Sequence, residues 1–377
     1  MYGRFLLGTT VLVLSSLAIL ALATSGQAAE GKPALQAEWE KTLQAAKQEG
    51  EVVLYTARDY DVLFSQFFQK RYPEIKVSGV ITANTPGVSQ RILAERRAEK
   101  YLWDVYIGGA STGYSMLYKG KVLDPLRPAL LLPEVVDKSK WWSGKHEYID
   151  EEEKYLFAFN GMFEPYFSYN TKLVDPKELK SLWDLLQPKW KGKMVMFDPT
   201  QPGSSTALRF MYHHPDLGPR YLKKLFTEMD LTMSRDLRQL GDWLASGKYP
   251  ICIFMSARRL LERPKAQGLP VDWFGPKAFK EGAILAGGSG QVGLINRAPH
   301  PNAARVAVNW LLSRDGQLAY QKILTSPDSR RIDISKEDVP PDSRRMEGVK
   351  YMVTERAEWM DLKPVLQLVN EIWKEKR

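Results

Sequence analysis

Residues 157–170, which read FAFNGMFEPYFSYN, decide how the rest of the chain is arranged. Their closely spaced aromatic side chains favour an extended, half-buried backbone. Gly161 and Pro165 interrupt the stretch, so it cannot form one unbroken central strand. A second extended stretch, residues 283–296 (AILAGGSGQVGLIN), brings the chain back after a second large block. Two such crossings between two blocks predict two lobes, a hinge and a cleft between the lobes.

The composition is that of a globular protein with two domains. The chain has 377 residues, of which 44% are hydrophobic, and this is enough for two sizeable cores. Its formal net charge of +9 comes from Lys and Arg side chains scattered among 44 acidic residues, without a long basic run. A nucleic-acid partner is therefore not expected. The single cysteine, Cys252, excludes an intramolecular disulfide, and its apolar surroundings favour a buried, inert thiol.

Residues 1–29 have the layout of a secretory signal peptide. Arg4 precedes an apolar run at residues 5–23, and small residues close that run. The pattern predicts cleavage after Ala28 or Ala29 and a mature protein in the periplasm. The alternative is a retained membrane anchor, since the run approaches the roughly 20 residues that a membrane span needs.

Strands and helices alternate in the block before the first crossing. The hydrophobic pattern predicts strands at residues 51–55, 75–81 and 103–107. Helices are predicted between them, at residues 61–72 and 88–100. Alternation at this spacing is typical of a parallel, doubly wound sheet.

The block after the first crossing repeats this pattern. Strands are predicted at residues 193–197 and 251–255, and each leads into a helix through a loop of small polar residues. Ser181 and Asp184 have the spacing of a capping box and predict a short helix before Pro188.

We therefore expect an α/β protein made of two doubly wound lobes that are joined by two crossing hinge strands. The expected division is residues 30–156 and 297–377 for the first lobe, residues 171–282 for the second lobe, and residues 157–170 and 283–296 for the hinge. Within the returning segment, the sequence predicts a polar surface loop at residues 326–345 and a final helix at residues 362–374.

No motif in the sequence assembles an enzyme or a metal centre. Residues 288–293 (GSGQVG) match the dinucleotide fingerprint, but the chain continues as a strand where that fingerprint needs a helix N-terminus. His213 and His214 are adjacent near a predicted helix end, where the helix dipole explains them as well as a metal does. No catalytic residue, cofactor or metal ligand is predicted.

Four loops are the candidates for ligand binding. Each follows a predicted strand, contains small and polar residues, and opens a helix. In a doubly wound sheet such loops gather at the carboxyl ends of the strands, where ligands bind. Free backbone amides and Ser or Thr hydroxyls at a helix N-terminus suit an anionic group. Ordinary helix capping by the same residues is the alternative for any single loop.

Two arginines favour an anionic ligand. Arg58 and Arg258 lie just beyond predicted strand ends, and a guanidinium holds a carboxylate or phosphate through two hydrogen bonds. The alternatives are surface ion pairs for both arginines, or a cation such as a polyamine bound by Asp59, Glu164 and Tyr166. The candidate ligand-binding residues are Thr56, Arg58, Asp59, Ser111, Thr112, Glu164, Ser204, Ser205, Thr206, Ser256, Arg258 and Ser289.

Five segments, spread over nearly the whole mature chain, carry a resemblance to a known family. They are EGEVVLYTA (49–57), FQKRYPEI (68–75), WDVYIGG (103–109), LWDLLQPKWKGK (182–193) and APHPNAA (298–304). The chain resembles the extracellular solute-binding proteins of bacterial ABC importers, family 1, in the type 2 periplasmic binding class. The similar branch contains ferric-ion, thiamine, phosphonate and polyamine binders.

The resemblance implies a function as well as a fold. It implies capture of a small solute by hinge closure in the periplasm, with a membrane permease and an ATPase as partners, and we expect a monomer. Ferric-ion binders of this family use adjacent tyrosines from the second lobe, with histidine and acidic ligands from the first. This sequence has no adjacent tyrosines, and Arg58 and Asp59 stand where the histidine would be expected. A small organic anion, such as a carboxylate or phosphonate, is therefore the expected solute. The alternatives are a metal ion, a polyamine, or a secreted transferase-type enzyme with the same two-lobed fold.

Overall fold

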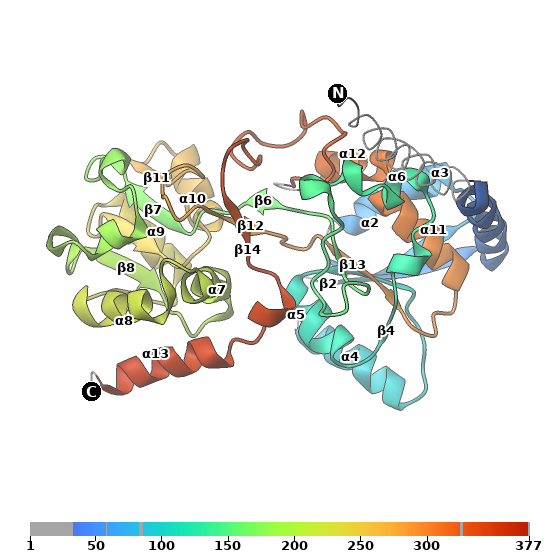
Figure 1. The fold of residues 1–377 in the computed structure, drawn as a ribbon, viewed down its shortest axis with the longest axis horizontal. Helices are drawn as coiled ribbons and strands as arrows, with labels where there is room; N and C mark the ends of the chain where they lie inside the picture. The colour runs from blue at the N-terminus through green and yellow to red at the C-terminus, as the bar shows by residue number, and fades with distance from the viewer. Residues whose placement is uncertain (1–32, 58, 83–85, 325–326, 376–377) are drawn as a thin grey trace, which may run out of the picture.

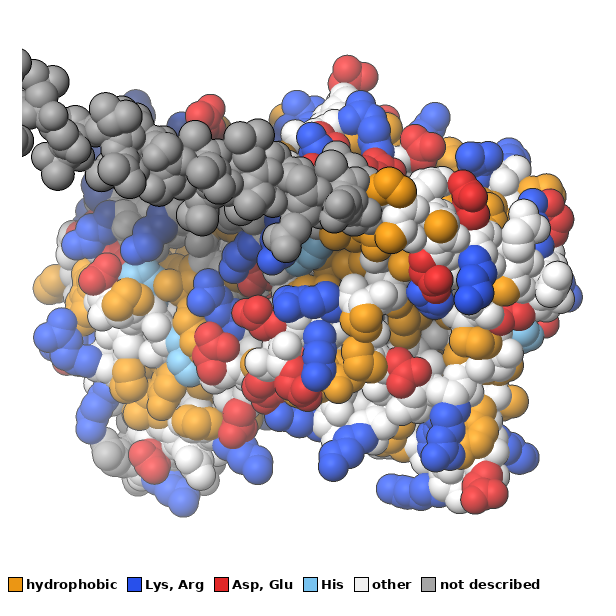
Figure 2. Space-filling model, turned by 45° about the vertical axis from the view of Figure 1, so that its right-hand side comes forward, with side chains coloured by type: hydrophobic (Ala, Val, Ile, Leu, Met, Phe, Trp, Pro, Cys, Tyr) orange, Lys and Arg blue, Asp and Glu red, His pale blue; other side chains and the backbone are white. Residues whose placement is uncertain are grey.

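The computed structural model describes residues 33–57, 59–82, 86–324 and 327–375. Figure 1 shows two lobes side by side along the long axis of the molecule, with extended segments running between them. The expected signal peptide lies outside the described residues. Within the described part of the chain, no helix has the length and apolar character needed to cross a membrane. On the face shown in Figure 2, basic and acidic side chains are interspersed.

The first lobe is built on a six-stranded sheet with the order β2-β1-β3-β13-β4, and β5 also pairs with β13. Strands β1, β2 and β3 are parallel, as the alternating pattern predicted, whereas the returning strand β13 is antiparallel to β3. The strands are β1 (Glu51–Ala57), β2 (Lys76–Thr82), β3 (Val105–Gly108), β4 (Leu123–Asp124), β5 (Phe157–Ala158) and β13 (Gln291–Ile295).

Helices cover both faces of this sheet. The helix predicted at residues 61–72 is divided into α2, a π-helical stretch (Phe64–Phe68) and α3, and its Phe64 and Phe68 rings pack on Trp310. A helix at residues 33–49 precedes β1. The others are α2 (Tyr60–Leu63), α3 (Gln69–Arg71), α4 (Pro86–Arg97), α5 (Ala110–Thr112), α6 (Pro133–Val136), α11 (Pro301–Leu312) and α12 (Arg314–Ile323).

The second lobe has its own five-stranded sheet, with the order β11-β7-β10-β8-β9. Strands β8, β9 and β10 are parallel, and β7, which enters from the first crossing, is antiparallel to β10. The strands are β7 (Phe167–Asn170), β8 (Met194–Phe197), β9 (Thr232–Ser234), β10 (Ile251–Ile253) and β11 (Val271–Trp273). The helices are α7 (Ser205–His213), α8 (Gly218–Glu228), α9 (Leu237–Ala245) and α10 (Ala257–Ala266).

Two local predictions in this lobe are confirmed. Ser181 and Asp184 form a reciprocal capping box, which opens a 3₁₀ helix at Leu182–Leu186. Cys252 is buried in β10, and burial raises the pKa of its thiol to about 12. Such a thiol stays protonated at neutral pH and is a poor nucleophile.

The hinge contains a third strand, β14 (Tyr351–Val353), that the sequence did not indicate. Strand β12 (Ala283–Ala286) of the second crossing pairs antiparallel with β6 (Met162–Phe163) of the first crossing and parallel with β14. The two expected crossings are therefore joined by a third passage of the chain near its end. Figure 1 shows these three strands in the space between the lobes.

The expectation that residues 297–377 all belong to the first lobe needs correction for the last helix. Helix α13 (Lys363–Glu375) packs against α7 and α8 of the second lobe. Val365, Val369 and Ile372 are buried in the core of that lobe. The apolar face of the helix therefore determines which lobe the last helix packs against.

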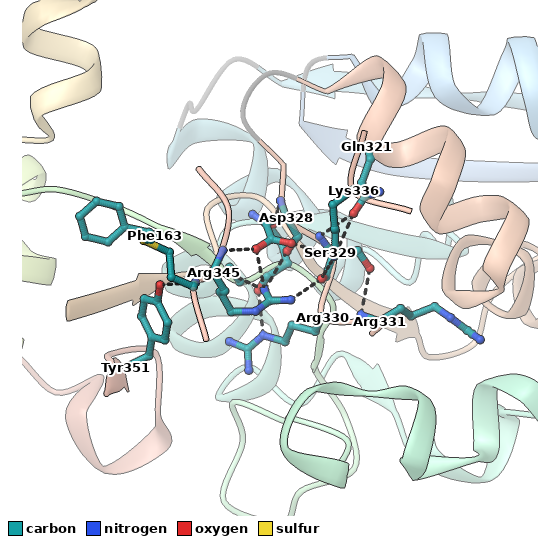
Figure 3. Close-up of polar contacts among 12 residues, drawn as sticks. Phe163, Gln321, Asp328, Ser329, Arg330, Arg331, Lys336, Arg345 and Tyr351 are labelled. Carbon is teal, nitrogen blue, oxygen red and sulfur yellow. Dashed lines mark hydrogen bonds and ion pairs between the residues drawn. The ribbon is translucent and has the colours of Figure 1, made fainter. Parts of the chain in front are cut away.

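The segment expected as a surface loop is anchored by buried charges instead. Figure 3 shows Asp328 in contact with Arg345 and Lys336, and Arg345 donating to the Ser329 carbonyl oxygen. The carboxylate of Asp328 lies 2.8 Å from Lys336 Nζ and 3.3 Å from Arg345 Nη1. Arg345 also donates to the carbonyl oxygen of Gly161, in the first crossing. These contacts fix residues 327–345 against the hinge.

Glu164, in the same hinge, connects β6 to the second lobe. The Ser256 hydroxyl donates to its Oε1 at 2.6 Å, and the Arg258 guanidinium nearby forms an ion pair with Asp342 at 2.9 Å. Burial raises the pKa of Glu164 to about 7, while the Ser256 hydrogen bond and the Arg258 charge oppose that rise and the Asp342 charge adds to it. Near neutral pH the folded protein therefore carries a proton on Glu164 that the unfolded chain would release.

This proton makes the stability of the parent protein fall as pH rises. Because the folded-state pKa of about 7 lies above the ordinary 4.5, the loss occurs between these two values and is complete above pH 7. Glu164→Gln has no titrating group at this position and does not lose stability in this way. The unfolding free energy of the variant minus that of the parent should therefore be roughly 3 kcal/mol larger at pH 8 than at pH 4.5. Urea unfolding at the two pH values measures this difference. Glu347→Gln, at an exposed glutamate, is the control, and an equal parent–variant difference at both pH values would contradict the assignment.

Candidate functional site

A cavity of 590 Å³ lies between the two lobes and is the candidate site. Both lobes and two of the hinge passages contribute to its wall. The lining residues are Tyr55, Thr56, Ala57, Tyr106, Ile107, Gly108, Gly109, Ala110, Ser111, Thr112, Ser115, Met116, Gly203, Ser205, Thr206, Arg209, Gly288 and Glu355.

The ends of strands place most of these residues, as the doubly wound pattern predicts. Thr56 is near the end of β1, Ser111 and Thr112 follow β3 in α5, and Ser205 and Thr206 begin α7 of the second lobe. Parallel strands end at one edge of their sheet, so their loops converge there. The structure thus brings together five of the twelve residues singled out in the sequence, and they come from both lobes.

The other candidates lie elsewhere or outside the described residues. Arg58 is not among the described residues. Arg258 does not line the cavity, because its guanidinium is engaged by Asp342 and by the Phe163 carbonyl oxygen. The Ser204 hydroxyl is buried and donates to the Asp198 carbonyl oxygen at 2.6 Å. Asp59, Glu164, Ser256 and Ser289 are likewise absent from the wall.

The residues proposed for a cation do not assemble a site of useful size. Glu164 and Tyr166 line a separate cavity of 20 Å³, to which Asp59 does not contribute. That volume is close to what one water molecule needs. The described residues also contain no group of three His, Cys, Asp or Glu side chains that could hold a metal ion. His213 stacks on Trp359 with ring centroids 4.9 Å apart, and His214 bonds to the Glu281 carbonyl oxygen.

Arg209, which the sequence analysis missed, is the cationic residue of the described cavity wall. It is 3% exposed, and burial lowers the pKa of its guanidinium. A signal for it was present in the sequence. Arg209 stands four residues after Ser205 on the same helix, and this spacing places both side chains on one face.

The contacts of Arg209 leave its charge without a direct counter-ion. Its Nη1 donates to the Thr354 carbonyl oxygen at 3.4 Å and to Met360 Sδ at 3.5 Å, and its Nη2 donates to Ser205 Oγ at 3.3 Å. All three acceptors are neutral, and Nε has no partner among the described residues. A buried cation in this state is costly unless an anion joins it.

Glu355, also missed, supplies the carboxylate of the wall. It follows the third hinge strand β14 and is 8% exposed. Burial raises the pKa of its carboxyl group, whereas the charges of Arg209 and Arg330 and a backbone hydrogen bond lower it. No local pattern could have indicated it, because Glu355 follows the polar segment that reads as a surface loop and reaches the cavity only through the unexpected strand.

Gly288 lines the cavity, and the neighbouring Gly287 contacts Glu355. Strand β13 begins at Gln291, so no helix N-terminus follows the glycine-rich residues, as the sequence predicted. A Cβ atom at Gly287 would lie 2.1 Å from Glu355 Oε2 and 2.2 Å from Gln291 Nε2. A side chain at position 287 would therefore force the ends of the Glu355 and Gln291 side chains to move.

Comparisons with known proteins agree with this architecture. In the structure of the Trichodesmium protein IdiA (FutA) in complex with iron and citrate, the match covers 86% of this chain and 99% of that one, with a TM-score of 0.66 and 18% identity. Iron-bound HitA from Pseudomonas aeruginosa matches over 85% of this chain and 99% of its own, with a TM-score of 0.60 and 15% identity. AfuA from Actinobacillus pleuropneumoniae, bound to fructose-6-phosphate, matches over 85% and 96%, with a TM-score of 0.55 and 19% identity.

These identities are low, and the structural likeness therefore establishes the type 2 periplasmic binding fold alone. No curated protein sequence matches the chain. The family model described as bacterial extracellular solute-binding protein, however, matches residues 36–318, which is most of the sequence. The chain therefore belongs to the family of bacterial extracellular solute-binding proteins.

Proposed function

We propose that this protein is the solute-binding component of a bacterial ABC importer and that it captures a small organic anion between its lobes. The solute is a carboxylate, a phosphonate or a phosphate ester, which the protein delivers to a membrane permease driven by an ATPase. The family match, the two lobes and the hinge support the general role. The expected signal peptide would bring the protein to the periplasm, where we expect it to act as a monomer.

The unpaired charge of Arg209 is the observation that carries the choice of an anion. The buried arginines around the hinge have carboxylate partners: Arg331 lies 2.8 Å from Asp333, and Arg330 lies 3.4 Å from Glu147. Arg209 is equally buried, lines the cavity, and contacts only neutral acceptors. An anionic group in the cavity would provide the charge-assisted hydrogen bonds that this guanidinium lacks.

The hydroxyl groups of the wall and the size of the cavity suit the same kind of ligand. Hydroxyl groups of Thr56, Ser111 and Thr206 line the cavity, and neutral donors of this kind complement oxygen atoms of a small acid. A volume of 590 Å³ is within the roughly 300–1,000 Å³ of small-molecule pockets. Two proteins of the same fold are bound to citrate with iron and to fructose-6-phosphate, and both ligands carry anionic groups.

A thermal-shift screen identifies the ligand class. The probes are citrate, inorganic phosphate, methylphosphonate, glucose 6-phosphate, ferric citrate and spermidine, because a ligand of the folded state raises the apparent melting temperature. We expect at least one metal-free anion to do so. A shift with spermidine alone would favour a polyamine, and consumption of the stabilising compound would favour the enzyme alternative.

Closure of the lobes is expected to accompany binding. The lobes are connected by the small sheet β14-β12-β6, which is the arrangement expected of a hinge. Small-angle scattering with the strongest stabilising anion of the screen should show a smaller radius of gyration than the free protein. A radius that does not change at saturation would count against hinge closure.

Loss of the Arg209 charge should weaken binding of the same anion. A charge-assisted contact contributes on the order of 1.5–3 kcal/mol, so Arg209→Gln should raise the dissociation constant about tenfold or more in calorimetry. Arg209→Lys should recover only part of this loss, since an ammonium cannot reproduce the planar fork of a guanidinium.

Arg259→Gln is the matched control, because Arg259 is an exposed arginine on α10. Melting curves show whether each variant is folded. If a folded Arg209→Gln variant bound the anion with the affinity of the parent, Arg209 would not take part in binding.

A further inference from the structure

Glu355 gives the candidate site a second charged side chain, and a simple anion would leave this carboxylate without a positively charged partner. Among the lining residues that the structure describes, Arg209 and Glu355 are the only two with charged side chains, and their charges are opposite. Arg209 lies on α7 of the second lobe, whereas Glu355 follows the hinge strand β14. The structure records no hydrogen bond or ion pair between these two described residues, although their charges influence each other.

Only one of the two oxygen atoms of the Glu355 carboxylate accepts hydrogen bonds from described residues. Its Oε2 accepts hydrogen bonds from the Gly287 backbone N–H at 3.0 Å and from Gln291 Nε2 at 2.9 Å. Its Oε1 accepts no hydrogen bond from a described residue. The two hydrogen bonds to Oε2 hold the carboxylate in place beside Gly287. One acceptor atom of a buried, fixed carboxylate is therefore free for a ligand.

A ligand that is only an anion does not satisfy this wall. It would neutralise Arg209 but place a second negative charge in the same cavity as Glu355, and like charges repel each other. The charge of Arg330 also favours the ionised form of Glu355, but Arg330 does not line the cavity, and it shares its charge with Glu147 at 3.4 Å. A ligand with both charges satisfies both residues at once.

We propose that the ligand is a small zwitterion, an organic acid that also carries an ammonium group. Its acidic group binds Arg209, and its ammonium group donates to Glu355 Oε1. This inference rests on the proposed function for the acidic half and adds the cationic half. It makes Glu355 a residue that determines specificity and selects amino acids over the corresponding acids without nitrogen.

Calorimetry with matched pairs of compounds tests the proposal on the full mature protein. The pairs are glycine and acetate, β-alanine and propionate, 4-aminobutyrate and butyrate, and 3-aminopropylphosphonate and propylphosphonate. The series varies the distance between the two charges. In the best-fitting pair, the amino compound should bind at least about tenfold more tightly than its partner.

Glu355→Gln should abolish most of this preference, because the uncharged amide keeps the size of the side chain but not its attraction for an ammonium group. Its affinity for the compound without nitrogen should stay the same or rise, since the repulsion is gone. Glu358→Gln, at an exposed glutamate three residues later, should keep the parent preference.

The outcomes separate this inference from the proposed function. If the acids without nitrogen, or citrate or phosphate, bind the parent as tightly as every amino compound, the zwitterion is excluded while the anion proposal stands. If the folded Glu355→Gln variant still prefers the amino compounds, Glu355 does not determine the specificity. If no acid in either series binds and the screen finds no anion, both proposals fail. The parent comparison needs no variant, so it decides even if Glu355→Gln does not fold.

Discussion

Backbone pairing of β12 with β6 and β14 is the constraint on which the rest of the structure depends. These three short strands come from parts of the chain that are far apart in sequence, and each leads directly to a different element of a lobe. Strand β6 continues to β7 of the second sheet, β12 continues to β13 of the first sheet, and β14 continues to Glu355 and α13. Their register therefore determines how the two sheets and both sides of the cavity stand relative to each other.

Charge is distributed around this sheet in two different ways. Next to this sheet, arginines form ion pairs with carboxylates, as in Arg345 with Asp328 and Arg258 with Asp342. Paired charges of this kind are costly to separate, because removing one partner leaves the other buried alone. In the cavity, Arg209 and Glu355 are buried without a direct contact between them. The protein thus pairs charge around the strands that connect the lobes and leaves charge unpaired at the proposed ligand site.

The repeated strand–loop–helix pattern was enough to predict much of this structure. Thr56, Ser111 and Thr206 were predicted to meet because they follow strands of doubly wound sheets, and the geometry of such sheets brings these ends together. The capping box at Ser181 was legible because both of its partners lie within four residues. The two extended crossings indicated two lobes and the family resemblance added the type 2 periplasmic binding class, and the family model and the solved structures support both.

What could not be predicted depends on contacts between distant residues. Glu355 lies in the cavity because β14 pairs with β12, and a three-residue strand in a polar segment has too little pattern to be recognised. Arg258 was placed in the cleft because it follows a strand, but Asp342, more than eighty residues later, engages it. The final helix was assigned to the first lobe by chain order, whereas its apolar face fits the second. Sequence position says little about such pairings.

The position of α13 also affects the order in which the protein acquires its structure. The core of the second lobe includes Ile372, and the core of the first lobe includes Tyr320. A chain that emerges N-terminus first therefore cannot complete the core of the first lobe before Tyr320 is present, or the core of the second lobe before Ile372 is present. Many contacts of the described chain join residues that are far apart in sequence, and such contacts slow folding. If the protein is exported as residues 1–29 lead us to expect, it would cross the membrane with the core of its second lobe unfinished and complete that core on the far side.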